Sequence, residues 1–465
     1  MHQRGSMLEI KPVEALAVTL ALLSGMSLGI IKLQLVPHVP VILAIFLLIV
    51  YGIIKKVKVK DLETAMLEGA QSGLGAVLIF FFIGMLISSW MASGTIPTFI
   101  YIAFELITGK WFYAIVFIIT AAVGLGIGSS LTTAATIGAA FMGVGATLGL
   151  SPAITAGAIV SGAFFGDKMS PLSDTTTLAS STVNVDLFEH IKNMTWTTIP
   201  AFIITIVLFF ILSPDETEAN IDNASIVKQE LLNLNLVHWY SLIPFAILAI
   251  LAVKKVPAVI TLGSGTLVAM LISLFITSKG EWGGLLSSLY TGFKAETEVE
   301  VVASLLSRGG IESMLFSVAL VLLALSMGGL LFKLGILPAL LTGINKGIEK
   351  TSILFCTTAT SAIGINLLLG EQYLSIILTG NTFEPYFRRA GLHPKNLSRV
   401  LEDAGTVINP LVPWSVCGVF LAGVLGVSTV DYAVFAFFCL VSPVLTILAG
   451  LTGISITKLD EKKTA

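Results

Sequence analysis

The chain has 465 residues, of which 55% are hydrophobic and only 12% are charged, with a formal net charge of −2 at pH 7. Soluble domains carry about 25% charged residues, so this composition excludes a molecule whose whole surface faces water. The near-neutral net charge gives no support for a nucleic-acid partner. Most of the surface is therefore expected to face a lipid bilayer.

Apolar runs that approach the length of a membrane crossing recur along the whole chain. A membrane-spanning helix needs about 20 apolar residues. The runs that approach or reach this length are Val13–Leu33, Pro37–Ile54, Gly73–Ala92, Phe112–Gly128, Thr195–Leu212, Leu236–Val253, Val256–Thr277, Ser313–Leu334, Ser352–Leu369 and Val430–Ile456. The pattern predicts an all-α polytopic membrane protein, one transmembrane domain over residues 1–465, with about ten to thirteen membrane segments.

Basic residues in short connecting segments predict the orientation, because cytoplasmic loops carry an excess of lysine and arginine. Two basic clusters contain Lys55, Lys56, Lys58 and Lys60, and later Arg388, Arg389, Lys395 and Arg399. The segment 214–235 is acidic instead, with Asp215, Glu216, Glu218 and Asp222. We therefore expect a bacterial inner membrane, with both termini cytoplasmic and 214–235 forming an acidic external loop.

Two parts of the chain resemble each other. Leu86–Pro97 and Met327–Pro338 share an apolar pattern and a Gly-x-x-Pro ending, at an offset of 241 residues from Gly94 to Gly335. We predict two inverted repeats, residues 37–213 and 236–456, separated by the acidic loop 214–235. Repeats of this kind are common in secondary transporters, where discontinuous helices from both halves form a shared site near the bilayer midplane.

The first repeat contains an unusual cluster of glycine and hydroxyl residues at Gly124–Gly138. Glycine allows a helix to unwind, and the freed carbonyls and hydroxyls can then coordinate a cation. The residues expected to act in this way are Gly128, Ser129, Ser130 and Thr132. Close helix packing through small residues is the alternative explanation.

The equivalent stretch of the second repeat, Ile363–Ile377, contains Asn366 and Glu371. A glutamate at membrane depth is costly and usually functional. We therefore include both residues in the predicted ion site.

A second pair of polar segments interrupts the apolar pattern at Gly166–Thr177 and Glu402–Ser415. Pro171 removes a backbone donor and disfavours helix at Ser170, so the helix should break there beside two carboxylates. Hard cations prefer such oxygen ligands. The predicted ligands here are Asp167, Ser170, Asp174 and Thr175, with Asp403 and Asn409 in the second copy. An ordinary polar loop contains the same residue types, but recurrence in both halves favours a site.

The segment Gly166–Thr177, which begins G-D-K-M-S-P-L-S-D-T-T, resembles the signature of the NhaC family of bacterial Na⁺/H⁺ antiporters. The resemblance covers essentially the whole chain. It implies that inward H⁺ movement drives Na⁺ efflux, with Na⁺ held through Asp167 and Asp174. The family also contains exchangers that couple malate uptake to lactate release, so these organic acids stay open as substrates.

The predicted mechanism is competition between Na⁺ and H⁺ for the same carboxylates, which bind one or the other. The expected exchanging acids are Asp167, Asp174, Glu371 and Asp403, with Ser170, Thr175, Asn366 and Asn409 as neutral oxygen ligands. Lys168 has two interpretations: it pairs with an acid when the site is empty, or its ammonium extends to the membrane surface.

Three other functions were weighed against cation exchange. An organic-acid exchanger needs a basic group or a helix N-terminus to hold a carboxylate. An intramembrane aspartyl hydrolase does not need duplicated broken helices. A passive channel does not need titratable acids. No cofactor is expected beyond the transported Na⁺ and H⁺, and a homodimer stays open.

Overall fold

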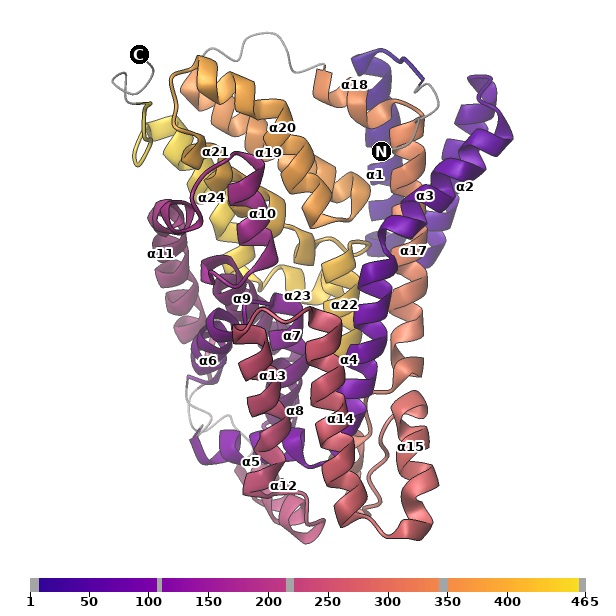
Figure 1. Cartoon of the computed structure of the whole chain (residues 1–465), viewed down its shortest axis with the longest axis vertical. Coiled ribbons are helices and arrows are strands. Elements are labelled where there is room, and N and C mark those ends of the chain that lie inside the picture. Colours follow the sequence, from indigo (N-terminus) through magenta and orange to yellow (C-terminus); the bar gives the residue numbers. More distant parts are fainter. Residues whose placement is uncertain (1–7, 107–110, 215–220, 343–349, 460–465) are drawn as a thin grey trace.

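The structure is a computed structural model that describes residues 8–106, 111–214, 221–342 and 350–459. Helices are the dominant regular element of these ranges, and the chain folds into a tall bundle (Figure 1). The all-α prediction is confirmed.

The helices before residue 214 contain most of the predicted apolar runs of the first repeat. They are α1 (Pro12–Ser27), α2 (His38–Ile54), α3 (Val59–Ser72), α4 (Leu74–Ala92), α5 (Thr95–Leu106), α6 (Phe112–Ile127), α7 (Ser130–Thr133), α8 (Ala139–Thr147), α9 (Pro152–Met169), α10 (Asp174–Thr182) and α11 (Leu187–Leu212). A π-helical turn, Leu28–Lys32, extends α1.

The second part of the chain adds a comparable set. It comprises α12 (Ile221–Asn233), α13 (Ile243–Val253), α14 (Ala258–Ile276), α15 (Trp282–Thr291), α16 (Glu300–Leu306), α17 (Ile311–Lys333), α18 (Ile336–Thr342), α19 (Thr351–Leu369), α20 (Gln372–Arg389), α21 (Pro394–Val400), α22 (Val416–Leu425), α23 (Thr429–Ala433) and α24 (Phe437–Thr452). A π-helical turn, Leu401–Thr406, continues α21, and a short 3₁₀ turn, Asn409–Leu411, follows it.

Six described helices are long and apolar enough to cross a membrane unaided: α1 with its π-helical extension, α4, α11, α14, α17 and α19. The segment Pro394–Leu411 and α22 form a seventh crossing if this pair, bent by 46°, counts as one span. Four shorter apolar helices add to these. All ten predicted apolar runs fall on helices, and the predicted total of ten to thirteen is reached only when the shorter helices are counted.

The outer surface of these helices is apolar, as a lipid environment requires. Phe275 on α14 is 89% exposed and Trp239, at the start of the segment leading into α13, is 80% exposed. In water, leaving such side chains exposed would forgo the free energy gained by burying them, about 25 cal/mol per Å² of apolar area. The surface therefore supports a bilayer as the solvent of this fold.

Part of the segment 214–235, predicted as an acidic external loop, is helical, because it contains α12. Asp215, Glu216, Glu218 and the side chain of Asp222 lie outside the part of the chain that the structure describes. Glu230 on α12 accepts a 2.5 Å hydrogen bond from the Thr297 hydroxyl, which lowers the pKa of the Glu230 carboxyl. This bond ties α12 to the segment before α16.

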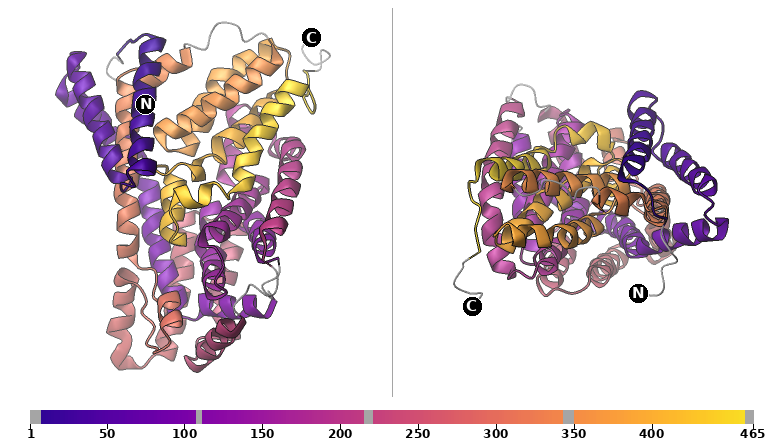
Figure 2. Two further views of the ribbon diagram at one scale, coloured as in Figure 1. Left: turned by 180° about the vertical axis from the view of Figure 1, so that it is seen from behind. Right: turned by 90° about the horizontal axis from the view of Figure 1, so that it is seen from above.

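Segments far apart in the chain lie side by side in the middle of the bundle. Helix α9 packs against α6, α23 and α24, and the turn Leu401–Thr406 packs against α19 and α20 (Figures 1 and 2). Gly166 on α9 is required for the close approach to α6, since a Cβ there would lie 2.5 Å from the backbone nitrogen of Leu125. This packing brings the polar end of α9 against the polar segment after α21.

Candidate functional site

Helix α6 ends at a glycine whose backbone is left-handed. Gly128 has φ 69° and ψ 32°, and its N–H donates to the carbonyl of Gly124 at 2.8 Å. A side chain would also lack space, because a Cβ on Gly128 would lie 2.6 Å from the Cβ of Leu172. Ser129 is extended and caps α7 by accepting the N–H of Thr132 at 3.3 Å.

Helix α19 ends in the same way. Gly370 has φ 66° and ψ 18°, and the extended Glu371 caps α20 by accepting the N–H of Leu374 at 2.7 Å. A carboxylate is favourable at a helix N-terminus. Glu371, a predicted exchanging acid, is half-buried, and its carboxylate is already bonded to the backbone of α20.

The polar segment after α9 contains a third helix end. Ser170 is extended, and Ser173 caps α10 by accepting the N–H of Thr176 at 3.3 Å. Ser170 accepts the N–H of Leu172 at 3.2 Å, and Thr175 lies 3.0 Å from the Ser173 hydroxyl. The predicted ligands Ser170 and Thr175 are therefore buried residues that also stabilise this turn.

Asp167 lies in the last turn of α9 and is 3% exposed. The Ser130 hydroxyl donates to its Oδ2 at 2.8 Å, while Oδ1 has no hydrogen-bond partner of ordinary geometry among the described residues. Asp167 and Asp174 are close enough to repel one another. The structure thus brings Ser130 from the start of α7 to this predicted acid, and the Ser173 hydroxyl also lies beside its carboxylate.

Asp174 differs from Asp167 in its surroundings. It is exposed, and the Tyr373 hydroxyl from α20 donates to its Oδ2. Glu371 lies close enough to Asp174 to repel it. Tyr373 was not among the predicted site residues, and its hydroxyl links α20 to Asp174 at the start of α10.

Lys168 is fully buried and forms an ion pair with Asp403, which is also fully buried. Its ammonium lies 5.6 Å from the ring centroid of Phe438. Of the two interpretations of Lys168, pairing with an acid is the one observed here, and the side chain does not extend to the surface. Asp403 keeps one oxygen, Oδ2, without a hydrogen-bond partner among the described residues.

Asn366 and Asn409 form a buried amide pair. Asn409 donates to the side-chain oxygen of Asn366 at 2.8 Å, and Asn366 donates to the carbonyl of Gly405 at 2.5 Å. The Asn409 side-chain oxygen accepts the N–H of Cys417 at 2.9 Å. These bonds connect α19, the π-helical turn after α21 and α22, so the pair fixes the positions of the three elements.

Glu402 is the first residue of the predicted polar segment Glu402–Ser415 and was not among the predicted exchanging acids. It is fully buried, and neither carboxylate oxygen has a hydrogen-bond partner of ordinary geometry within the described ranges. Asp167, Lys168 and Thr406 are its main side-chain electrostatic neighbours. It lies in a π-helical turn, a geometry frequent at functional sites that the sequence pattern did not indicate.

Arg399 was assigned to a basic cytoplasmic loop, and this assignment is wrong. It lies on α21 and is fully buried. Its Nη1 donates to the Ser455 hydroxyl at 2.9 Å, while Nε and Nη2 have no partner among the residues described. Arg399 also attracts Asp403. Its apolar neighbours Leu397, Val400 and Leu401 form the core contacts that hold this helix in place.

The buried charged residues where α9 meets the segment after α21 form a cluster that has more acids than bases. Its buried acids are Asp167, Glu402 and Asp403, and its buried bases are Lys168 and Arg399. The described residues include no group of three or more His, Cys, Asp or Glu side chains placed to hold a resident metal ion. The surplus of acids can be neutralised by a cation or by protons.

Comparison with known proteins identifies the relatives of this chain. Residues 162–454 match the family described as the Na⁺/H⁺ antiporter family. The Na⁺/H⁺ antiporter NhaC of Alkalihalophilus pseudofirmus is 40% identical over 94% of this chain and 96% of its own length. NhaC of Bacillus subtilis is 38% identical over 90% and 93%. The malate-2H⁺/Na⁺-lactate antiporter of Bacillus subtilis is 35% identical over 88% and 87%.

Proposed function

Because this chain belongs to the Na⁺/H⁺ antiporter family, we propose that it is a secondary antiporter that exchanges cytoplasmic Na⁺ for external H⁺. The relatives that it matches are antiporters, and its apolar helices support a location in the cell membrane. In this proposal both termini are cytoplasmic, and no cofactor is needed beyond the transported ions.

One observation carries the proposal: the buried acids of the cluster outnumber its buried bases where α9 meets the turn after α21. Lys168 neutralises Asp403, whereas Asp167 and Glu402 have no ion-pair partner in the described part of the chain. A buried charge without compensation costs several kcal/mol or more. These two acids are therefore stable only when a cation or protons neutralise them.

This requirement produces exchange. Na⁺ bound at Oδ1 of Asp167 neutralises the same carboxylate that a proton neutralises, so the two substrates exclude each other. Asp174 and the Ser130 and Ser170 hydroxyls supply further oxygens for the ion. Lys168 acts as an internal cation that keeps Asp403 neutralised in both states.

We also propose that the chain consists of two inverted repeats. Three pairs of helix caps support this at one offset of 242 residues: Ser129 and Glu371, Ser151 and His393, and Ser173 and Ser415. The short helices α5 and α18 each follow a left-handed glycine and lie at opposite ends of the bundle (Figure 1). In this alignment Asp167 corresponds to Asn409, and Lys168 corresponds to Pro410.

Proteoliposomes with an acid interior and a fluorescent pH reporter test the function. Addition of NaCl outside is expected to raise the internal pH, because Na⁺ enters in exchange for H⁺. Choline chloride is the matched control and should leave the pH unchanged. No pH response to NaCl, with folded protein in the liposomes, would contradict the proposal.

Buried Arg399 favours a second candidate, the Na⁺/H⁺-coupled organic acid exchanger. Its two unpartnered nitrogens are the kind of group that holds a carboxylate, and a malate/lactate antiporter is among the relatives. The same liposomes loaded with lactate and given malate outside separate the two candidates. A pH response that needs both acids would establish the organic acid exchanger.

A further inference from the structure

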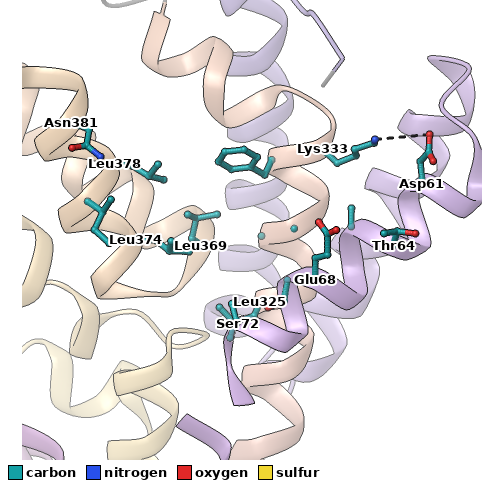
Figure 3. A pocket seen from close by; sticks show the side chains of 16 residues that line it. Asp61, Thr64, Glu68, Ser72, Leu325, Lys333, Leu369, Leu374, Leu378 and Asn381 are labelled. Carbon is teal, nitrogen blue, oxygen red and sulfur yellow. Dashed lines mark hydrogen bonds and ion pairs between the residues drawn. The ribbon is translucent and has the colours of Figure 1, made fainter. Parts of the chain in front are cut away.

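A cavity of about 630 Å³ lies outside the ion site, between α3 and α17 on one side and α19 and α20 on the other (Figure 3). Its size falls in the range of about 300–1,000 Å³ that is usual for small-molecule sites. Nothing in the exchange mechanism proposed above uses it.

The wall formed by α20 is mostly apolar, with the polar Asn381 beyond the apolar residues. Leu374, Ile377 and Leu378 face the cavity, and Leu369 at the end of α19 and Phe332 on α17 extend the apolar surface. A bare Na⁺ does not need such a wall. The apolar side chains would instead favour an occupant that has a hydrocarbon body.

The wall formed by α3 is polar. Asp61, Thr64, Glu68 and Ser72 line the cavity at spacings of three and four residues, which place them on one helix face. Figure 3 shows them opposite Leu374 and Leu378. The cavity is thus amphipathic, with hydrogen-bonding groups on one side and hydrocarbon on the other.

The charge of the polar wall is negative. Lys333 lies 3.9 Å from Asp61 and offsets it, whereas Glu68 has neither an ion pair nor a hydrogen bond to any described residue. An anionic occupant would meet this unpaired carboxylate at close range. The charge therefore favours a cation.

We propose that the cavity binds an amphipathic monovalent organic cation, with its charged group against Glu68 and its apolar body against α20. Size, the apolar wall and the unpaired carboxylate each point to this chemical class. Leu369 and Leu374 flank Gly370 and Glu371, so an occupant lies next to the connection between α19 and α20. Bound there, it inhibits cation exchange, a consequence that rests on the function proposed above.

Binding is measured independently of transport by protection of a cysteine. Ser72→Cys places a thiol in the cavity wall, and Cys356→Ser removes the half-exposed native cysteine. The rate of maleimide labelling is then measured in detergent with hexyltrimethylammonium, 1-hexanol or hexanesulfonate. The quaternary ammonium is chosen because it cannot carry protons across a membrane and so leaves pH gradients intact.

Hexyltrimethylammonium is expected to slow labelling, and the alcohol and the sulfonate are not. Glu68→Gln should weaken this protection about fivefold, the loss of one partly exposed ion pair. Glu63→Gln, on α3 but outside the cavity lining, is the matched control and should leave protection unchanged. Equal protection by hexanol, or protection of Glu68→Gln at the same concentrations as the wild type, would overturn the inference.

The same cation added to the proteoliposomes tests the consequence for transport. Inhibition of the NaCl-driven pH change that needs about fivefold more cation in Glu68→Gln supports it, and unchanged exchange at concentrations that protect the cysteine overturns it. Absence of any Na⁺-driven pH change in the wild type would contradict the proposed function alone, because the labelling rate reports only on the cavity.

Discussion

The end of α9 and the end of the segment after α21 have corresponding helix caps and different chemistry. Each helix starts at a capped residue followed by proline, Ser151–Pro152 and His393–Pro394, and each is followed by a serine cap. Near its end, however, α9 carries an acid and a base, Asp167 and Lys168, where the other segment carries an amide and a proline. The caps thus recur at one offset, whereas α9 is one continuous α-helix and the other segment passes from α21 through a π-helical turn and a 3₁₀ turn.

This difference indicates how the halves depend on each other. Lys168 finds its counter-charge in the other half, at Asp403, and not in its own. The buried amides Asn366 and Asn409 bind each other and hold the second half together. We infer that Asp167 in the first half and Glu402 in the second half supply the exchanging acids, while the amide pair Asn366 and Asn409 supplies a fixed framework.

The largest expected effect is the difference between substituting Asp167 and substituting its counterpart Asn409. Asp167→Asn removes the exchangeable carboxylate but keeps the side-chain shape, so Na⁺-driven proton flux should fall below detection while the protein still folds. Asn409→Asp should destabilise the fold instead, because the new carboxylate cannot donate to Asn366. Proton flux and retained monodisperse protein after heating are measured for both variants. Full exchange in Asp167→Asn would contradict the site.

Lys168→Met tests the link between the halves. It leaves Asp403 buried without its partner, which costs about 3–5 kcal/mol, and the fraction of monodisperse protein after heating should drop sharply. Lys168→Met combined with Asp403→Leu should recover much of the loss, since both charges are then absent. Lys333→Met, in a partly exposed pair at 3.9 Å, is the control and should change stability by less than about 1 kcal/mol. Equal losses in the two single variants would contradict a buried pair.

Gly128 and Gly370, the left-handed glycines that end α6 and α19, should differ in their tolerance of alanine. Either substitution places a side chain at positive φ, which costs about 1–2 kcal/mol. Gly128→Ala adds a clash with Leu172 at 2.6 Å, whereas the nearest atom to a Cβ on Gly370 is the Trp414 carbonyl oxygen at 3.0 Å. Overpacking of this kind costs about 1–3 kcal/mol more, so Gly128→Ala should be the less stable variant. The reverse order in heating assays would show that the α6–α7 connection is looser than described.

The smallest effect concerns the caps Ser129 and Glu371. Ser129→Ala and Glu371→Ala each remove one acceptor of a helix N–H, at about 1 kcal/mol. If Glu371 is only a cap, Glu371→Gln should retain the stability and the Na⁺ dependence of exchange. If it also exchanges protons, as the sequence predicts, Glu371→Gln should weaken the apparent Na⁺ affinity at unchanged stability. The Na⁺ titration of proton flux in proteoliposomes distinguishes these results.

The long apolar runs predicted the main helices because lipid imposes one rule on every spanning segment: its backbone must be satisfied within a helix. Glycine and proline likewise predicted where helices end, since their backbone preferences are local. The polar motif around Asp167 and Lys168 was found for the same reason, as its residues are neighbours in the chain.

Features that depend on packing between distant segments were missed or misjudged. The amphipathic helix α3 does not look like a membrane segment, and its place against α17 depends on a close approach between Gly69 and Gly329. Arg399 was assigned to a loop because a charge cluster in the sequence does not show which side chains turn inward. Glu402 and Tyr373 interact with Asp167 and Lys168 and with Asp174, which are more than one hundred residues away in the chain.

Proton release on Na⁺ binding tests most directly the claim that both ions use the same carboxylate. Purified protein in weakly buffered detergent solution receives NaCl or choline chloride while a pH dye records released protons. The account predicts release with NaCl alone, and a much smaller release from Asp167→Asn. Release of equal size from Asp167→Asn, or Na⁺ binding by the wild type without any release, would contradict it.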